Sequence, residues 1–210
     1  MNAALRQTLR TRLGRNPEPS AGIVDSQTIR TTGVGGRERG FDPAKQVEGR
    51  KRHLLVDTEG LLMKVRVHSA KVPDADGIRL LLEPVRGRLG RLWHLWVEAG
   101  YQGRGGKRWA EEVFGLSVEV VRKPKRPVPE EVAKRWAEEW AKEGVEVDWQ
   151  RLMPPKGFKV LPRRWVVERT FSWLGQNRRM SKDYERLPES SEAFVYAAMS
   201  RLMARRLARA

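Results

Sequence analysis

The sequence contains no cysteine. This absence excludes structural disulfides, cysteine-based metal sites and a cysteine nucleophile. No apolar run approaches the ~20 residues that a membrane-spanning helix needs. The first residues, MNAALRQTLRTRLGRN, also lack the apolar core of a secretory signal. We therefore expect a cytoplasmic protein with no membrane partner.

Acidic residues are few compared with basic ones. The 210-residue chain carries 42 lysines and arginines against 26 aspartates and glutamates, a net charge of +16. Such an excess predicts an anionic partner, most simply nucleic acid. A GC-rich genome, whose codons favour arginine, would also enrich the chain in basic residues, but their clustering favours nucleic acid. The length is that of one domain with a hydrophobic core.

The spacing of apolar residues predicts an α/β fold. Residues 1–15 read as a short basic amphipathic helix, followed by a linker that ends near residue 20. Strands are expected at 22–29, 50–57, 61–70, 92–100 and 116–124, and helices at 73–89 and 106–115. This order indicates a mixed five-stranded sheet flanked by helices.

Two segments depart from this pattern. The glycine-rich stretch 31–43 reads as a loop, and it lacks the Gly-Lys-Ser/Thr ending of a nucleotide-binding P-loop. Residues 124–157 are bracketed by prolines and highly charged, which predicts a small insertion with a helical centre. Within it, Trp136 and Trp140 lie four residues apart. These rings either pack the helix on the domain or stack on splayed DNA bases.

The end of the chain is mainly helical. In the expected helix within 161–185, an apolar stripe is formed by Val166, Thr170, Trp173 and Leu174, and Glu168 points away from it. The side that carries Glu168 is otherwise basic. The final stretch 191–210 predicts another basic amphipathic helix.

Three acids stand apart from the solvated ones. Asp25 lies inside the apolar strand GIVDSQ, Glu98 ends the strand LWHLWV, and Glu168 lies on the basic side of the late helix. A carboxylate inside a strand is costly unless it is paired or bound to a metal. Each acid alone is explained by a salt bridge to a nearby arginine; together they indicate a catalytic site.

The segments around these acids resemble the DDE transposases, and specifically their insertion-sequence-five family. The matching motifs are VDSQT (24–28), VEAGYQG (97–103) and RRWVVERTFSWL (163–174), with GRKRHLLVDTEGLL and RRMSKDYE as further family segments. The resemblance implies an RNase H-like catalytic domain over residues 21–210, preceded by the basic helix and linker at 1–20. The charged insertion falls before the last catalytic helix.

The resemblance also implies an activity: metal-dependent DNA strand cleavage and 3′-OH strand transfer of an insertion sequence. Asp25, Glu98 and Glu168 would hold two Mg²⁺ (or Mn²⁺) ions, with Asp25 bridging both. Independently, such chemistry needs no protein nucleophile, because two ions about 3.5–4 Å apart activate the attacking oxygen and stabilise the leaving one. Mg²⁺ prefers oxygen ligands and keeps several waters, so a few carboxylates suffice.

The chain departs from the family pattern at two places. The second acid is Glu98 where the family has aspartate, and the extra methylene moves the carboxylate by up to ~1.5 Å, against a tolerance of about 0.5 Å. A catalytically impaired DNA-binding remnant is therefore the alternative, and a plain nuclease of the same fold is a third interpretation. The lysine expected seven residues after Glu168 is Gly175, so Arg178, Arg179 or Lys182 would take its role.

Basic side chains near these motifs are the expected DNA contacts. They are Arg50, Lys51, Arg52, His53, Arg163, Arg164, Arg178, Arg179 and Lys182. Alternatively, the charges at 49–53 protect an edge strand, and His53 is structural. Asp57 reads as a turn residue, and Asp74 and Asp76 as acids at a helix N-terminus.

The resemblance further implies the partners. These are double-stranded DNA at the element ends and the target, and a second copy of the chain, because two ends are processed together. Only about 20 residues precede the first catalytic strand, so an N-terminal half encoded in an overlapping reading frame is a further expected partner. A bacterial, nucleoid-associated location follows from the substrate.

Overall fold

A computed structural model describes residues 1–33, 36–102, 104–122, 128–145 and 163–209 of the protein. The chain divides into two compact units, one formed by Met1–Val121 with Pro162–Ala210 and the other by Arg122–Leu161. The expected insertion at 124–157 falls within the second unit. None of the described helices combines the length and apolar character that a bilayer crossing requires.

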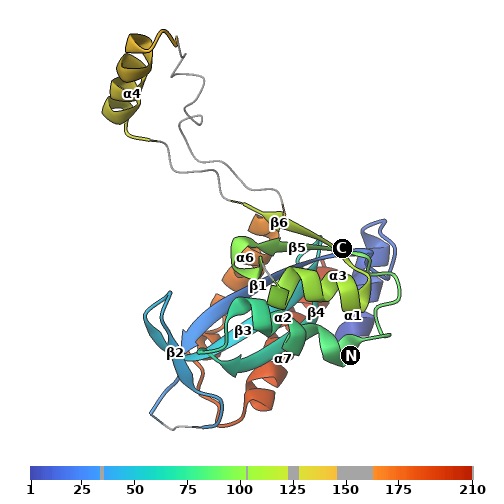
Figure 1. Cartoon of the computed structure of the whole chain (residues 1–210). Helices are drawn as coiled ribbons and strands as arrows, with labels where there is room; N and C mark the ends of the chain where they lie inside the picture. The colour runs from blue at the N-terminus through green and yellow to red at the C-terminus, as the bar shows by residue number, and fades with distance from the viewer. Residues whose placement is uncertain (34–35, 103, 123–127, 146–162, 210) are drawn as a thin grey trace. The chain divides into compact units, whose positions relative to one another are not determined.

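The first unit is built on a curled mixed sheet (Figure 1). Its described strands are β1 (Ala21–Arg30), β2 (Gly40–Asp42), β3 (Val47–Asp57), β4 (Leu62–Ser69), β5 (His94–Glu98) and β6 (Ser117–Val121). They lie in the order β2-β3-β1-β5-β6, with β4 also paired to β3. β3 is antiparallel to β1 and β4, whereas β5 is parallel to β1 and β6 to β5. This arrangement is compatible with an RNase H-like fold.

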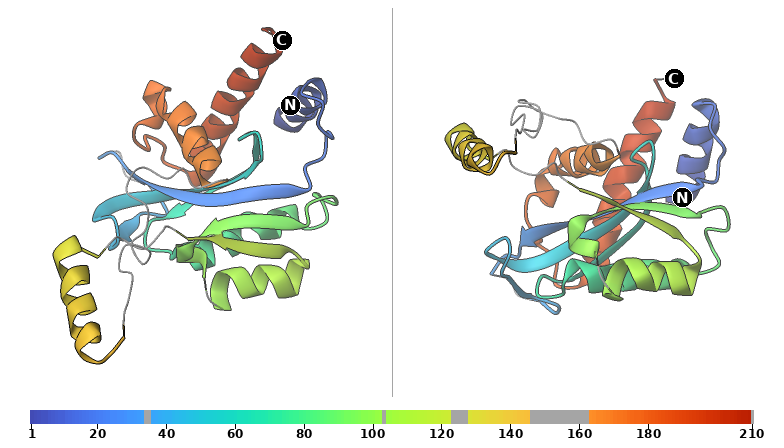
Figure 2. Two further views of the ribbon diagram at one scale, coloured as in Figure 1. Left: turned by 90° about the horizontal axis from the view of Figure 1, so that it is seen from above. Right: turned by 45° about the horizontal axis from the view of Figure 1, so that its top comes forward.

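Helices cover both faces of the sheet. The described helices of the first unit are α1 (Asn2–Arg12), α2 (Asp74–Leu82), α3 (Trp109–Phe114), α6 (Arg164–Gly175) and α7 (Pro188–Leu207). The helix α4 (Glu130–Lys142) belongs to the second unit. Figure 2 shows α6 and α7 on one side of the sheet and α2 and α3 on the other. Because successive strand residues point to opposite faces, Ile23 packs with Val167 and Met199 of the first layer, and Val24 packs with Ile78 of the second.

The sheet differs from the expected one by a sixth described strand. β2 lies inside the stretch 31–43 that the sequence predicts to be a loop, and it pairs with the start of β3. Only three residues, Gly-Phe-Asp, form it, which is too short for an alternating pattern. The expected helix at 73–89 is also shorter, because Pro84 follows the end of α2 and turns the chain into the 3₁₀ segment Glu83–Val85.

The first helix packs onto the rest of this unit. Leu9 is buried with Leu61 and Met203. Arg10 Nη1 lies 2.6 Å from Asp57 Oδ2 in a buried ion pair. Asp57 also accepts backbone hydrogen bonds from the turn that joins β3 to β4. α1 is therefore part of the packed core of the first unit, and Asp57 has a structural role in that turn.

The second unit contains α4. Its helix begins after Pro129 with Glu130 and Glu131 in the first turn, where acids favour the helix dipole. Trp136 and Trp140 remain 43% and 41% exposed. Packing on the domain and stacking on DNA bases both stay predictions for this pair.

Candidate active site

The first two predicted acids lie on neighbouring parallel strands. β1 and β5 pair in a register that sets Val24 opposite Val97, so Asp25 and Glu98 follow at the next position of each strand. Alternation places both side chains on the sheet face that α6 and α7 cover, because Ile23 and Trp96 pack on that side. The spacing of two strands therefore determines that these carboxylates are neighbours.

The third predicted acid, Glu168, lies on α6, which covers this face of the sheet. Glu168 follows Arg164 by one helical turn, and Arg164 Nε lies 3.1 Å from Glu168 Oε1. The Nη2 of the same guanidinium contacts Glu98 Oε1. Arg164 thus joins the second and third acids, although 70 residues separate them along the chain. α6 also contacts β1 and β5, so the sheet fixes where these groups lie.

Asp25 is electrostatically linked to the same group. Burial raises its pKa to about 7, and the negative charge of Glu98 adds to this effect. The Ser26 backbone N–H donates a hydrogen bond of 2.7 Å to Asp25 Oδ1, and this bond, with the charges of Lys45 and Arg164, opposes the rise in pKa. At neutral pH, Asp25 therefore ionises more readily when further positive charge is near.

These acids fit a divalent cation by their chemistry. Carboxylate oxygens are the ligands that Mg²⁺ prefers, and the buried Oε1 of Glu98 is already paired with the Arg164 guanidinium. Within the described part of the chain, however, no group of three or more histidine, aspartate or glutamate side chains is positioned to hold a metal ion. Instead, the Arg164 guanidinium pairs with both Glu98 and Glu168. A cation that bound both acids would displace it.

An aromatic cluster borders the acids on β5. The guanidinium of Arg163 lies over the Trp96 ring, 4.7 Å from its centroid, and the His94 ring packs edge-on to Trp96 at 4.4 Å. The Trp96 indole N–H donates to Glu119 on β6 at 2.9 Å. Arg163 has φ of 75°, a conformation that a side chain other than glycine rarely adopts. The residue just before α6 is therefore strained beside the candidate site.

A polar cluster supports the site from the opposite face of the sheet. Ser26 Oγ donates to Asp74 Oδ1 at 2.8 Å, and Lys51 Nζ donates to the same oxygen at 3.0 Å. His53 is fully buried and shares a 2.7 Å hydrogen bond with His68. Burial lowers the pKa of His53 to about 3, so its imidazole is neutral. Asp74 thus fixes β1 next to Asp25, a role beyond that of an acid at a helix N-terminus.

Four of the expected DNA contacts are buried, which corrects their interpretation. Arg50, Arg52 and His53 are 0%, 1% and 0% exposed, and Lys51 is 5% exposed. Arg50 Nη1 lies 3.3 Å from Asp183 Oδ2, with both side chains fully buried. These side chains lie in the middle of the sheet, where β1 and β4 flank β3 on both sides, so the edge-strand interpretation is also wrong.

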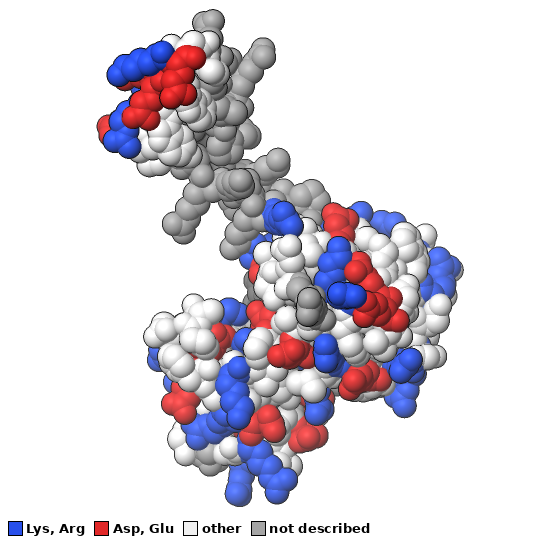
Figure 3. Space-filling view, in the orientation of Figure 1, with Lys and Arg blue, Asp and Glu red and all other residues white. Residues whose placement is uncertain are grey.

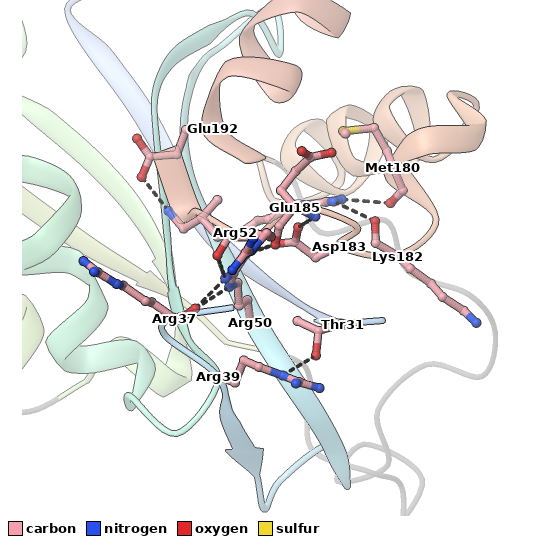
Figure 4. Close-up of polar contacts among 12 residues, drawn as sticks. Thr31, Arg37, Arg39, Arg50, Arg52, Met180, Lys182, Asp183, Glu185 and Glu192 are labelled. Atoms are coloured by element: carbon pink, nitrogen blue, oxygen red, sulfur yellow. Dashed lines mark hydrogen bonds and ion pairs between the residues drawn. The ribbon is translucent and has the colours of Figure 1, made fainter. Parts of the chain in front are cut away.

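Figure 4 shows what the buried arginines do. Arg50 donates to the backbone carbonyls of Arg37, Glu185 and Arg186, and Arg52 donates to that of Met180 at 2.9 Å. The two side chains therefore hold the connection between α6 and α7 against the sheet. A basic motif in the sequence alone does not distinguish such backbone binding from DNA binding.

The remaining expected DNA contacts differ in exposure. Arg163, Arg178, Arg179 and Lys182 are exposed, whereas Arg164 is half-buried among the acids. Arg179 pairs with Glu185 at 2.7 Å and stacks on Phe194. On the face drawn in Figure 3, acidic side chains lie interspersed among the basic ones. That face presents no uninterrupted basic patch.

Two functional features were not identified from the sequence. The first is the position of Arg164 between two acids, for which the spacing of Arg164 and Glu168 at i, i+4 was a usable signal. The second is a row of arginines at the end of α7 and just beyond it, Arg201, Arg205 and Arg209, which the same spacing reveals.

The comparison with known proteins gives the family. A family model described as "Transposase DDE domain" matches residues 16–203, a span that includes Asp25, Glu98 and Glu168. No curated protein is matched significantly. Transposases of this family act on DNA as nucleases and transesterases, generally with divalent metal ions. Because this match covers most of the length of the chain, the chain belongs to the transposase DDE domain family.

Proposed function

We propose that the protein is an insertion-sequence-five transposase with an RNase H-like catalytic domain. It cleaves DNA at the 3′ ends of its element and joins each 3′-OH to target DNA. One observation carries the proposal: Asp25 within β1 and Glu98 at the end of β5 are neighbours on adjacent strands, and Arg164 links Glu98 to Glu168 on the helix that covers them. Distant segments of the chain thus bring carboxylates to one place.

The residues of this place have distinct roles in the proposal. Asp25, Glu98 and Glu168 hold two Mg²⁺ (or Mn²⁺) ions, which when bound lower the pKa of water and stabilise the leaving oxygen. Bound cations would lower the raised pKa of Asp25, so this carboxyl would be fully ionised at neutral pH. Arg164 leaves the acids and binds a DNA phosphate, for which its planar fork is suited. Asp74 and Ser26 keep the strand of Asp25 in position.

The test is metal-dependent cleavage of a duplex taken from the DNA that flanks the coding sequence. We expect a 3′-end nick with Mg²⁺ or Mn²⁺ and none in a chelator. The Asp25→Asn and Glu168→Gln variants should lose cleavage while still binding the duplex. A nick that persists in both variants would contradict the assignment of these acids.

An impaired, DNA-binding remnant is the second candidate. The observation that favours it is Glu98, whose longer side chain contacts Arg164. If the wild-type protein binds the duplex but does not nick it, and the Glu98→Asp variant nicks it, the remnant interpretation is correct. If neither protein nicks the duplex with any metal while both bind it, the enzyme proposal fails.

The proposal includes the assembly on DNA. Two element ends are joined in one reaction, which requires two active sites and hence a homodimer on double-stranded DNA. A recognition region from an overlapping reading frame would bring the ends to the dimer. Light scattering of the protein with a paired-end duplex, compared with a single-end duplex, tests the dimer.

A further inference from the structure

A row of arginines follows one side of α7. Arg201, Arg205 and Arg209 recur every four residues, so they lie on one face near the end of this helix and just beyond it. All three side chains are exposed. Among the residues that the structure describes, none of the three has an ion-pair or side-chain hydrogen-bond partner.

These arginines line a groove between α7 and the end of α6. Its volume is about 370 Å³, and α6 and α7 lie together in one layer in Figure 2. Trp173, Leu174, Met199 and Leu202 contribute apolar lining. The lining also includes Gln176, Asn177 and Arg206, but no acidic residue.

Arginine also stiffens the apolar part of the groove. The Arg206 guanidinium lies 4.3 Å from the centroid of a Trp173 ring, and that of Arg169 lies 4.7 Å from it. Arg169 also donates to the backbone carbonyl of Glu59 at 3.1 Å, which ties α6 to the turn between β3 and β4. The Trp173 ring is thereby held in a defined orientation.

The charges do not serve the helix itself. Like charges at i, i+4 destabilise a helix by about 0.2–0.5 kcal/mol per pair. The helix dipole favours cations only within the last turn, and this effect is screened by salt, so it does not account for Arg201. An unpaired cationic row above an apolar groove therefore indicates an anionic ligand of repeating charge.

We propose that this groove binds the phosphate backbone of double-stranded DNA. Arginine forks match phosphate oxygens, and the repeating charge of the row suits a polymer better than a single anion. At about 100° per residue, Trp173 points roughly 140° away from Glu168 around α6, so the DNA here is not the scissile strand at the acids. The inference rests on the proposed function, since it requires that the protein act on DNA.

The test compares the salt dependence of duplex binding between two matched triple variants. Arg201→Gln, Arg205→Gln and Arg209→Gln remove the row. Arg86→Gln, Arg88→Gln and Arg91→Gln remove the same charge from an exposed loop before β5. The logarithm of the binding constant falls linearly with the logarithm of the salt concentration, and each phosphate contact adds about 0.9 to the steepness of this fall. The α7 triple variant should therefore reduce the steepness by ~2–3. The loop variant should lower it by less than 1.

The outcomes separate the inference from the proposed function. If the wild-type protein does not bind the duplex, the proposed function itself fails. If the wild type binds and the α7 variant keeps the wild-type slope, the groove serves some other acidic partner and the inference is wrong. Equal reductions in both variants would indicate a general charge effect and would also overturn it. If the α7 triple variant has a lowered Tm, the single variant Arg205→Gln replaces it, because one substitution disturbs the fold less. The steepness of its salt dependence should be reduced by about 0.9.

Discussion

Arg164 in the first turn of α6 contacts the carboxylate of Glu98 at the end of β5. The same guanidinium pairs with Glu168, so one internal cation links two of the acids that are proposed to hold the metal ions. In the protein without DNA, the proposed metal binding would therefore break these two ion pairs.

We expect the Arg164→Gln variant to bind Mn²⁺ more tightly than the wild type in the absence of DNA. Each of these partly exposed ion pairs is worth up to ~1 kcal/mol, which corresponds to an affinity increase of roughly 3–30-fold for the two together. Isothermal titration of Mn²⁺ gives the affinity. Arg163→Gln is the control, because Arg163 stacks on Trp96 and pairs with neither acid within the described residues. Equal Mn²⁺ affinity in the wild type and the Arg164→Gln variant would contradict this role.

The raised pKa of Asp25 predicts how stability depends on pH. Its pKa is about 7 in the folded chain and about 3.9 in the unfolded one. The folded state therefore binds more protons between these values, and the free energy of unfolding contributed by Asp25 decreases as pH rises from about 4 to about 7. The Asp25→Asn variant cannot ionise, so its stability relative to the wild type should increase over this range.

Thermal unfolding in a chelator at pH 5 and pH 7.5 measures this difference. These pKa values give a relative gain of about 2–3 kcal/mol between the two pH values, which corresponds to ~5–10 °C in Tm for a chain of this size. Changes in Tm with pH that are the same in both proteins would show that Asp25 keeps an ordinary pKa.

The buried pair of Arg50 and Asp183 should control stability. Removing one partner of a buried ion pair costs about 3–5 kcal/mol, because the other charge stays buried and unpaired. Arg50→Met should therefore lower the free energy of unfolding by about this amount, measured by chemical denaturation. Arg88→Met, at an exposed position, is the control and should change stability by less than ~0.5 kcal/mol. A stable Arg50→Met variant that has lost DNA affinity would instead restore Arg50 as a DNA contact.

Close packing of α2 on His53 predicts that Gly77→Ala is destabilising. A Cβ atom at Gly77 would lie 2.2 Å from His53 Cε1, and the His53 ring cannot easily retreat because His68 holds it. Overpacking of this kind costs about 1–3 kcal/mol, which outweighs the ~0.5–1 kcal/mol that alanine gains over glycine in a helix. Gly90→Ala, where a Cβ atom has no neighbour within 4 Å, should be nearly neutral. Equal Tm values for the two variants would show that α2 moves freely.

The strands could be predicted because apolar residues and turn signals repeat over several residues. The strand positions of Asp25 and Glu98 follow directly from that pattern, and the RRWVVERTFSWL motif placed Glu168 on a helix. β2 could not be predicted, because a three-residue strand is formed by its partner β3 and not by its own composition.

The direction in which a charged side chain points was harder to predict than its position. Arg50 and Arg52 lie in a basic run, yet they donate to the carbonyls of Glu185 and Met180, more than 120 residues away in the sequence. Arg164 likewise finds one partner by helical spacing and another through the sheet. The spacing of residues along a helix indicates the contact with Glu168. The contact with Glu98 exists only after the chain has folded, because β5 is far from α6 in the sequence.

The docking of α1 on α7 bears on how the chain acquires its fold during synthesis. Arg12 donates to the carbonyl of Leu207 at 2.7 Å, and Leu9 packs with Met203. The ribosome releases α1 before α7, so the surface on which α1 packs is complete only after α7 has emerged. We therefore expect α1 to contact the turn between β3 and β4 early, through Leu61 and Asp57, and to dock fully only after α7 has been synthesised.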